Sequence, residues 1–404
     1  MLNNPDYIIA RDLLLRLAVP VGTERVSLDQ CGGRILAADL AAEAPVPPFD
    51  RSAYDGYAFR SADVESASRE CPVTLRILEE IPAGAVPTVT VETGTAVKLL
   101  TGAPVPPGAD VVLKYERTRF DDASVTVFES LKPGSNIVKR GEDVQQGQVL
   151  ACAGTVIDAG LAGTLAAQGV AMPMAYRQPV IGLISTGNEV VEADADLAPG
   201  KIRNSNRTTL VAVLEGLGCQ PQYLGLAGDD VARIRERIEE GLERCDAVLL
   251  TGGVSVGDYD LTPDAMEQAG VEVLVRGVNM KPGMACAYGV KDGKLVLGLS
   301  GNPASSLTNF YAVVLPAIRT LCGRSDAIPA EITVTLASGF RKKSPLTRFL
   351  RGTLDLSDGT VRMTLPKEQG NVVLSSTIGC NVMAVVPAGS GPVEAGTSLK
   401  GFLL

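Results

Sequence analysis

The stretch D-A-V-L-L-T-G-G-V-S-V-G-D-Y-D, residues 246–260, decides the fold of the largest part of the chain. Its apolar run A-V-L-L has no polar break, which is typical of a strand buried on both faces of a parallel sheet. Gly252 and Gly253 let the backbone approach a ligand closely and direct N–H groups at an anion. Asp258 and Asp260 then supply carboxylates. We expect either a phosphate-and-metal site at the carboxyl end of a sheet or a tight turn with a helix-capping aspartate.

Strands and helices alternate on both sides of this stretch, between residues 179 and 328. Four more apolar runs predict strands, at residues 180–184, 222–226, 272–275 and 294–299. Segments with helical periodicity lie between them, and the last helix is expected to begin at Pro303, which suits a first turn. The alternation predicts an α/β domain with a parallel-type sheet and helices on both faces.

The flanking segments follow other patterns. An amphipathic helix is expected at residues 5–18, with Asp6 as its cap. Residues 73–150 alternate short β-prone runs with Pro and Gly turns, which predicts a small β-rich domain. After Pro329, several β-prone runs, one of them at residues 372–375, favour a small barrel or sandwich.

The composition narrows the class of protein. The 404 residues are 46% hydrophobic, enough for several domains with packed cores. The formal net charge is −9, tryptophan is absent and no basic run is interleaved with aromatic residues, so a nucleic-acid surface is not expected. No stretch reaches membrane-spanning length, and the N-terminus lacks a signal pattern. We expect a soluble cytoplasmic protein whose eight cysteines are reduced.

The chain has no histidine. This excludes a Ser-His-Asp triad, a histidine general base and histidine-ligated zinc. Proton transfer and metal binding therefore fall to Asp, Glu, Lys, Tyr or Cys.

Polar residues follow the ends of the predicted strands in the α/β domain. They are Glu189, Asp229, Asp258 or Asp260, and Asn302. Because the carboxyl ends of parallel strands share one edge of a sheet, these groups can converge there. Glycine turns, the start of the Pro303 helix and Lys281 add positive charge. Carboxylates without histidine suit Mg²⁺ bound to a phosphate, which indicates a magnesium-dependent enzyme acting on a phosphorylated ligand.

Other nucleotide-binding signatures are missing. The domain lacks G-x-x-x-x-G-K-[ST], so it is not a P-loop nucleotidase, and it lacks a clean G-x-G-x-x-G, so dinucleotide binding is weakly supported. A nucleotide hydrolase on a similar α/β domain is weakly supported for the same reason.

The motifs resemble those of the molybdopterin molybdenumtransferase family, which includes the E domain of gephyrin. The resemblance runs nearly from end to end of the chain. It rests on PPFDRSAYDGYA (47–58), LTGAPVPPGAD (100–110), GED (141–143), STGNE (185–189), GKIRNSN (200–206), TGGVSVGDYD (251–260), KPG (281–283), SGNPASS (300–306) and FLRG (349–352).

The resemblance implies four domains. An elongated helical or linker domain would comprise residues 1–45 and 144–178, with a β-rich domain of residues 46–143 inserted in it. An α/β molybdopterin-binding domain would span residues 179–328, and a C-terminal β-barrel would span residues 329–404.

The resemblance also implies a reaction. Members of this family insert molybdate or tungstate into adenylylated molybdopterin with release of AMP, as homodimers with each active site between subunits. By position, the catalytic residues would be Asp55, Thr101, Asp143, Glu189, Asp229 and Asp260. Three of these acids would bind Mg²⁺: Glu189, Asp229 and Asp260. Residues that would bind molybdopterin are Gly252, Gly253, Ser255, Lys281, Gly301, Asn302, Pro303 and Arg351.

Some positions depart from the family pattern: Val138, Gly277, Met284, Ser300 and Asn371. The groups lost are mainly cations and hydroxyls of the kind that hold an oxyanion, while the acidic set is intact. Each lost charge-assisted contact would cost ~1.5–3 kcal/mol of binding free energy. Arg140 and Arg276 lie next to two of the vacated positions, where they are placed to compensate.

Two functions follow from these observations. A molybdenumtransferase is favoured, because an inactive protein has no physical need of a complete acid set. The alternative is a non-catalytic paralogue that binds molybdopterin or a partner protein as a scaffold or carrier, which the vacated cationic positions suggest.

Overall fold

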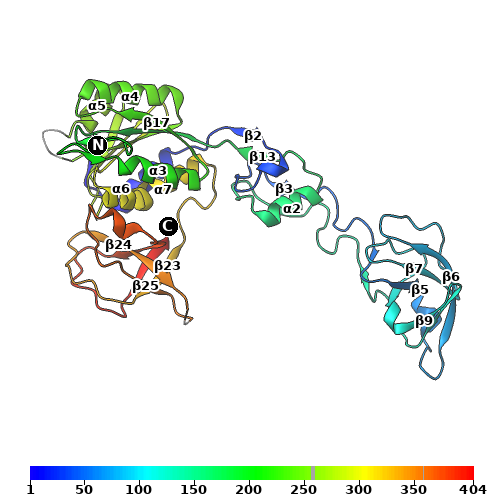
Figure 1. The fold of residues 1–404 in the computed structure, drawn as a ribbon. Coiled ribbons are helices and arrows are strands. Elements are labelled where there is room, and N and C mark those ends of the chain that lie inside the picture. Colours follow the sequence, from blue (N-terminus) through cyan, green and yellow to red (C-terminus); the bar gives the residue numbers. More distant parts are fainter. Residues whose placement is uncertain (256–259, 358) are drawn as a thin grey trace. The chain divides into compact units, whose positions relative to one another are not determined.

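The computed structural model describes residues 1–255, 260–357 and 359–404. The chain divides into two compact units, whose elements are labelled in Figure 1. Unit 1 comprises Met1–Ala38, Ala153–Ala162 and Ala171–Leu404, and unit 2 comprises Asp39–Cys152 and Gly163–Val170.

Unit 1 contains a seven-stranded sheet in the order β1-β19-β21-β22-β18-β14-β17. Its strands are β1 (Leu2–Asn3), β14 (Val180–Ser185), β17 (Gln220–Leu226), β18 (Ala247–Thr251), β19 (Glu272–Arg276), β21 (Cys286–Lys291) and β22 (Lys294–Leu299). β17, β14, β18 and β22 are parallel, as expected. β21 is antiparallel to both neighbours because the two-residue turn Asp292-Gly293, with φ of 50° and 77°, returns the chain directly into β22.

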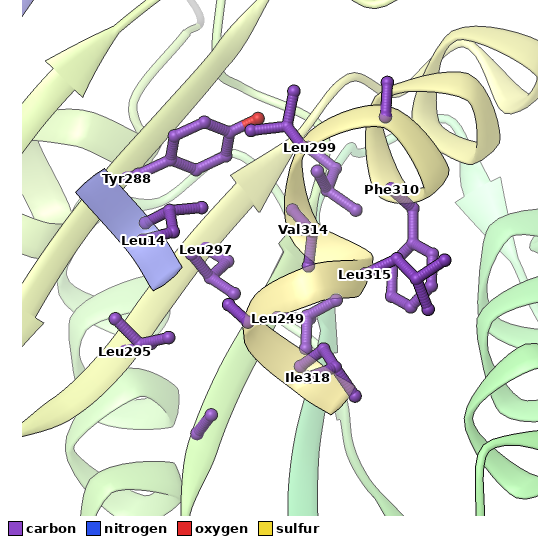
Figure 2. Close-up of a cluster of buried hydrophobic side chains, with 14 of the residues drawn as sticks. Leu14, Leu249, Tyr288, Leu295, Leu297, Leu299, Phe310, Val314, Leu315 and Ile318 are labelled. Atoms are coloured by element: carbon purple, nitrogen blue, oxygen red, sulfur yellow. The ribbon is translucent and has the colours of Figure 1, made fainter. Parts of the chain in front are cut away.

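β18 is buried on both faces, as its apolar sequence predicted. Residues Ala247 and Leu249 lie in one hydrophobic cluster, shown in part in Figure 2, where Leu249 lies beside Val314 and Ile318. Val248 and Leu250 lie in a second cluster. The strand therefore joins the two cores that the helices cover.

Helices cover both faces of this sheet. In unit 1 they are α1 (Tyr7–Leu17), α3 (Ser205–Gly216), α4 (Val231–Arg244), α5 (Thr262–Gln268), α6 (Pro303–Asn309), the π-helical turn η4 (Phe310–Val314) and α7 (Leu315–Leu321). Helices α1 and α3, the turn η4 and helix α7 contribute to the first cluster, and α4 and α5 contribute to the second. Side chains cap three of them, because Asp6, Asn204 and Asp230 each accept a backbone hydrogen bond from the first turn. Within the described residues, no helix has the length and apolar character to cross a membrane.

The first seventeen residues pack on the sheet and the first hydrophobic cluster of unit 1. β1 pairs with β19, and Ala10 and Leu14 of α1 are fully buried in the first cluster. The periodicity of α1 showed that one face must be buried, but it did not show against which element. Other short elements of the chain are β2 (Thr23–Arg25), η1 (Leu28–Gln30), α2 (Ala159–Ala167), β13 (Met174–Tyr176), β15 (Val190–Val191) and β16 (Ile202–Arg203).

The C-terminal region forms a closed five-stranded barrel. Its strands are β23 (Glu331–Leu336), β24 (Thr347–Asp355), β25 (Arg362–Thr364), β26 (Val382–Val386) and β27 (Ser398–Leu403), and β20 (Met280–Lys281) pairs with β24. The barrel closes because β24 pairs with both β25 and β26. The strand predicted at residues 372–375 is wrong, since the 3₁₀ turn η5 (Leu374–Thr377) takes its place.

Unit 2 is built on a six-stranded sheet in the order β8-β5-β7-β6-β10-β9. Its strands are β5 (Gly56–Phe59), β6 (Val73–Ile81), β7 (Thr95–Leu99), β8 (Val111–Lys114), β9 (Thr118–Phe120) and β10 (Ser124–Val127). Smaller elements are β3 (Leu40–Ala41), β4 (Arg51–Ser52), η2 (Ser61–Val64), η3 (Tyr115–Arg117), β11 (Ile137–Val138) and β12 (Val149–Ala151). Tyr57 and Phe59 are fully buried in its core.

Leu297→Ala tests the importance of the first cluster. Leu297 is fully buried on β22, so the truncation should lower the free energy of unfolding by about 2–5 kcal/mol. Urea unfolding followed by circular dichroism measures this loss. Leu197→Ala is the control, because Leu197 is 51% exposed and its loss should change stability by less than about 0.5 kcal/mol. Equal effects of the two substitutions would contradict the assigned core.

Candidate functional site

A cavity of about 810 Å³ lies at the carboxyl ends of the four parallel strands. It is lined by segments that follow β14, β17, β18 and β22, and by the start of α3. The sequence-predicted residues that line it are Glu189, Asp229, Gly252, Gly253, Ser255, Asp260, Gly301, Asn302 and Pro303. The structure thus brings these residues together at one edge of the sheet. Asp258, the alternative to Asp260, lies outside the described residues.

The glycine turn after β18 packs tightly against its neighbours. Gly252 and Gly253 have φ of 99° and 63°, which favours glycine. A Cβ on Gly252 would lie 2.5 Å from Thr186 Oγ1, and one on Gly253 would lie 2.9 Å from Thr262 Oγ1. The Gly252 N–H donates to Leu299 O at 2.9 Å. The backbone of these two glycines therefore lies close to Thr186 and Thr262 of the protein itself. The Gly252 N–H is hydrogen-bonded to β22 and is not free to bind a ligand.

The acids reach the cavity from different turns. Asp229 and Asn188 join the turns after β17 and β14, since Asp229 Oδ2 accepts from Asn188 N at 3.0 Å and Asn188 Oδ1 accepts from Asp229 N at 3.2 Å. The Glu189 carboxylate folds back over Gly187, where an added Cβ would lie 2.6 Å from Glu189 Oε2. Asp260 lines the same cavity.

These carboxylates suit a hard cation, but they do not form a finished cage. Within the described residues, no group of three or more Asp, Glu, Cys or His side chains is arranged to hold a metal ion. Mg²⁺ is commonly bound by one or two carboxylates, with waters and substrate phosphates completing its shell. The donor set therefore fits Mg²⁺ that arrives with a phosphorylated ligand.

The start of α6 is partly occupied by the protein itself. Asn302 precedes the helix, and the N–H groups of Ala304 and Ser305 donate to Asn371 O at 3.1 and 3.2 Å. We expected these first-turn donors to face an anion. In the structure, the backbone of the segment before η5 accepts them.

Arg351 and Lys281 are not among the residues that line the cavity. Arg351 is 1% exposed, and its guanidinium donates to Gly370 O at 3.3 Å and Ser376 Oγ at 3.0 Å. The Gln369 side chain also bridges the main-chain N–H and C=O of Arg351. Burial lowers the pKa of Arg351. Arg351 therefore fixes the segment that carries Asn371, and Lys281 lies exposed on β20.

A polar cluster behind the cavity escaped the sequence analysis. Tyr223 Oη donates to Glu192 Oε1 at 2.7 Å, and Arg207 donates to Glu192 Oε2 at 2.5 Å. The Arg207 guanidinium lies 4.0 Å from the centroid of the Tyr223 ring. Asn204 Nδ2, at the cavity, donates to Ser185 Oγ at 3.0 Å and to Tyr223 Oη at 3.2 Å.

This cluster supports one wall of the cavity. Burial, and then the hydrogen bond to Glu192, raises the pKa of Tyr223 to about 12, so its hydroxyl stays protonated and donates at neutral pH. Glu192 directly follows β15, and β15 pairs with β16 to place Val190 and Ile202 at the cavity. Glu192, Arg207 and Tyr223 lie in separate segments of the sequence. Of this cluster, the motif GKIRNSN (200–206) contains only Asn204.

The remaining predicted residues lie on unit 2. Asp55 Oδ1 accepts hydrogen bonds from Thr101 N at 2.7 Å and Thr101 Oγ1 at 2.8 Å. The hydrogen bond from the Thr101 N–H, and to a lesser extent the one from the Thr101 hydroxyl, holds the pKa of Asp55 below its usual value. Asp143 is exposed, and its N–H donates to Val46 O at 3.0 Å. Asp55 and Thr101 are thus a paired acid and hydroxyl.

The α/β domain with this cavity is a molybdopterin-binding type of domain, because residues 182–320 match the family model described as a probable molybdopterin binding domain. Residues 7–169 match the MoeA N-terminal region (domains I and II), and residues 333–403 match the MoeA C-terminal region (domain IV). The chain therefore belongs to the MoeA family.

Individual relatives agree with this assignment. The chain is 37% identical over 388 residues to a protein of Bacillus subtilis named molybdopterin molybdenumtransferase, covering 95% of this chain and 90% of the relative. A Staphylococcus aureus protein of the same name is 36% identical, covering 92% and 88%. The crystal structure of a molybdopterin biosynthesis moeA protein from Pyrococcus horikoshii OT3 is similar with a TM-score of 0.86 and 30% identity, covering 99% of this chain and 100% of that one.

Tyr223→Phe tests the cluster behind the cavity. Loss of the hydroxyl removes the bond to Glu192, worth about 1–3 kcal/mol, and should loosen the parallel pair of β15 and β16. Limited trypsin digestion should then cut after Lys201 and Arg203 about 5–50 times faster. Tyr115→Phe, which removes a hydroxyl bond to Leu99 O on unit 2, should leave these cuts unchanged. Equal cleavage of the wild-type chain and Tyr223→Phe would exclude this role.

Thr101→Val tests the pairing of Asp55. The variant keeps the backbone donor but loses the hydroxyl donor, so the pKa of Asp55 should rise toward its usual value of about 3.9. The folded-state pKa of Asp55 is lowered. The stabilisation from its hydrogen-bonded carboxylate is therefore fully present above the unfolded-state pKa, and it is lost as pH falls through the folded-state pKa. Carbon-13 NMR of the carboxyl group measures the change. The titration of Asp121, which is bonded to Ser124, should not move.

Proposed function

We propose that the chain inserts molybdate or tungstate into adenylylated molybdopterin, with release of AMP, in molybdenum cofactor biosynthesis. The observation that carries this proposal is the cavity that gathers Glu189, Asp229 and Asp260 within the molybdopterin-binding domain. Relatives named molybdopterin molybdenumtransferase, matched along nearly the whole chain, support transferase activity.

The cavity is suited to a phosphoanhydride substrate. In the reaction, an oxygen nucleophile attacks phosphorus, the bond between the two phosphates breaks, and AMP leaves. Glu189, Asp229 and Asp260 are the acids that would hold Mg²⁺ together with the substrate phosphates, and the ion would neutralise charge on those phosphates. Asp229 is held in place by Asn188, which orients one acid of the set. Asn302 and Pro303, at the opposite turn, would position the pterin.

Two chains would build the complete site. Asp55, Thr101 and Asp143 lie on unit 2, whereas the cavity lies on unit 1. The family resemblance implies a homodimer in which each active site draws on both subunits. We include that assembly in the proposal, with the bonded pair of Asp55 and Thr101 as the part contributed by unit 2.

Free thiols support a cytoplasmic location. All eight cysteines are free, and proteins with many unpaired thiols are typical of reducing compartments.

A scaffold or carrier remains the second candidate. Two observations favour it. The N–H groups in the first turn of α6 donate to Asn371 O, and cationic residues of the family pattern are missing from this chain. Such a protein would bind molybdopterin without releasing AMP.

AMP release distinguishes the two functions. The protein should release AMP from adenylylated molybdopterin when Mg²⁺ and molybdate or tungstate are present, and EDTA should stop the release. Asp229→Asn should lower the rate at least about 100-fold, a cost of about 2.7 kcal/mol, because it removes one charge from the acid set.

The adjacent residue is the matched control. Asp230 caps α4 and does not line the cavity, and Asn is an equally good cap, so Asp230→Asn should keep the rate within about threefold. No AMP release by the folded wild-type chain with either anion, combined with measurable pterin binding, would establish the scaffold instead.

A further inference from the structure

Two buried thiols meet at a place that the proposed reaction does not use. Cys219 follows α3 and precedes β17, and Cys322 caps the C-terminus of α7. Their sulfurs are 3.5 Å apart, and the residues are 5% and 4% exposed. Both belong to unit 1 and to the first hydrophobic cluster. They form a dithiol that lies apart from the residues of the cavity.

The backbone holds both residues in place. The Cys219 N–H donates to Leu214 O at 2.9 Å, and the Cys322 N–H donates to Ile318 O at 3.0 Å. Cys322 Sγ also lies 3.6 Å from Leu217 O. A disulfide bond is about 2.05 Å long, so bond formation requires the sulfurs to approach by about 1.5 Å. The paired helix ends are therefore already close to the arrangement of a cross-link.

A small crevice is lined in part by one of the two residues, Cys322. It is lined by Gly33, Arg34, Tyr176, Leu217, Gly218 and Cys322, and its volume is about 10 Å³. Space of this size holds about one water molecule. It suits a small oxidant such as hydrogen peroxide and excludes bulky disulfides such as oxidised glutathione.

Cys322 lines the crevice and Cys219 does not, so Cys322 is the thiol placed to meet an oxidant first. The pKa of Cys322 is lowered, chiefly by the hydrogen bond with Cys219. Burial opposes this effect, and the positive charges of Arg324 and Arg319 add to it. The pKa of Cys219 is raised, chiefly by the bond to Cys322. A thiolate is the nucleophile in reactions of cysteine, so Cys322 would react first and Cys219 would resolve the product.

We propose that Cys219 and Cys322 are an oxidation site for hydrogen peroxide, and that the product is an intramolecular disulfide joining the end of α3 to the end of α7. In the first step, Cys322 sulfur attacks peroxide, the O–O bond breaks, and Cys322 sulfenic acid and water form. In the second step, Cys219 sulfur attacks that sulfur, the S–S bond forms, and the hydroxyl group leaves with the Cys219 proton as water. Two thiols lose two electrons, and one peroxide becomes two waters.

The disulfide would stabilise the α/β domain without closing the cavity. It would link residues 103 positions apart, which restricts the unfolded chain. The cavity residues lie at the other ends of these helices. Asn204 precedes α3, and Pro303 begins α6, which continues through η4 into α7. Oxidation should therefore raise the melting temperature by about 5–10 °C and leave the cavity in place.

Mass spectrometry tests the site in the full chain with the exposed Cys71 and Cys152 changed to Ser. After peroxide and alkylation of free thiols, trypsin should yield peptides 208–233 and 320–324 joined by a disulfide, because each contains one cysteine. Dithiothreitol should separate them and restore the original melting temperature. A joined pair with the raised melting temperature is the expected result.

Single substitutions provide the controls. Cys322→Ser and Cys219→Ser should abolish both the joined peptides and the rise in melting temperature. Cys245→Ser should retain both, because Cys245 is also buried in unit 1 but its sulfur faces Gln222 Oε1 at 3.7 Å. Peroxide treatment that leaves both thiols free to alkylate, or that stops at sulfinic acid on Cys322, would overturn the proposal. These measurements do not depend on AMP release. A negative result for the disulfide would therefore leave the proposed function untouched, and absence of AMP release would leave the disulfide untouched.

Discussion

The architecture of unit 1 depends on the burial of β18 on both faces. Ala247 and Leu249 face one core and Val248 and Leu250 face the other, and burial of each large aliphatic side chain contributes about 1.5–3 kcal/mol. Such a strand is stable only inside a sheet with helices on both sides. Its parallel neighbours β14 and β22 then end at the same edge. The position of the cavity is a consequence of this burial.

The turns at that edge are held together by close backbone contacts. The glycines after β18 leave no room for a Cβ, because Thr186 and Thr262 lie against them. Asn206 Nδ2 donates to Gly301 O at 2.8 Å and so ties α3 to the turn before α6. The turns can therefore present their carboxylates from fixed positions. Preorganisation of this kind matters for phosphoryl chemistry, in which the protein acts mainly by positioning and charge.

Features with a local physical cause could be predicted from the sequence. The buried strand, the cap Asp6, and the convergence of Glu189 and Asp229 on one edge follow from patterns within single segments and from sheet topology. The β21–β22 hairpin also had a signal, Asp292-Gly293, which the expectation of parallel strands obscured.

Features set by long-range packing could not be predicted in this way. The docking of α1 and the replacement of a strand at residues 372–375 by η5 depend on partners that periodicity does not identify. The Tyr223 cluster is assembled from three segments, so no spacing in the sequence marks it. The contacts of Arg351 with Ser376 and Gly370 also join segments that no local pattern relates, and they hold the segment containing Asn371. Asn371 O accepts two first-turn donors of α6, so an oxyanion at that helix start would have to displace this segment. Glu189, Asp229 and Asp260 line the cavity without such a change, so the acids and the helix start differ in how accessible they are to a ligand.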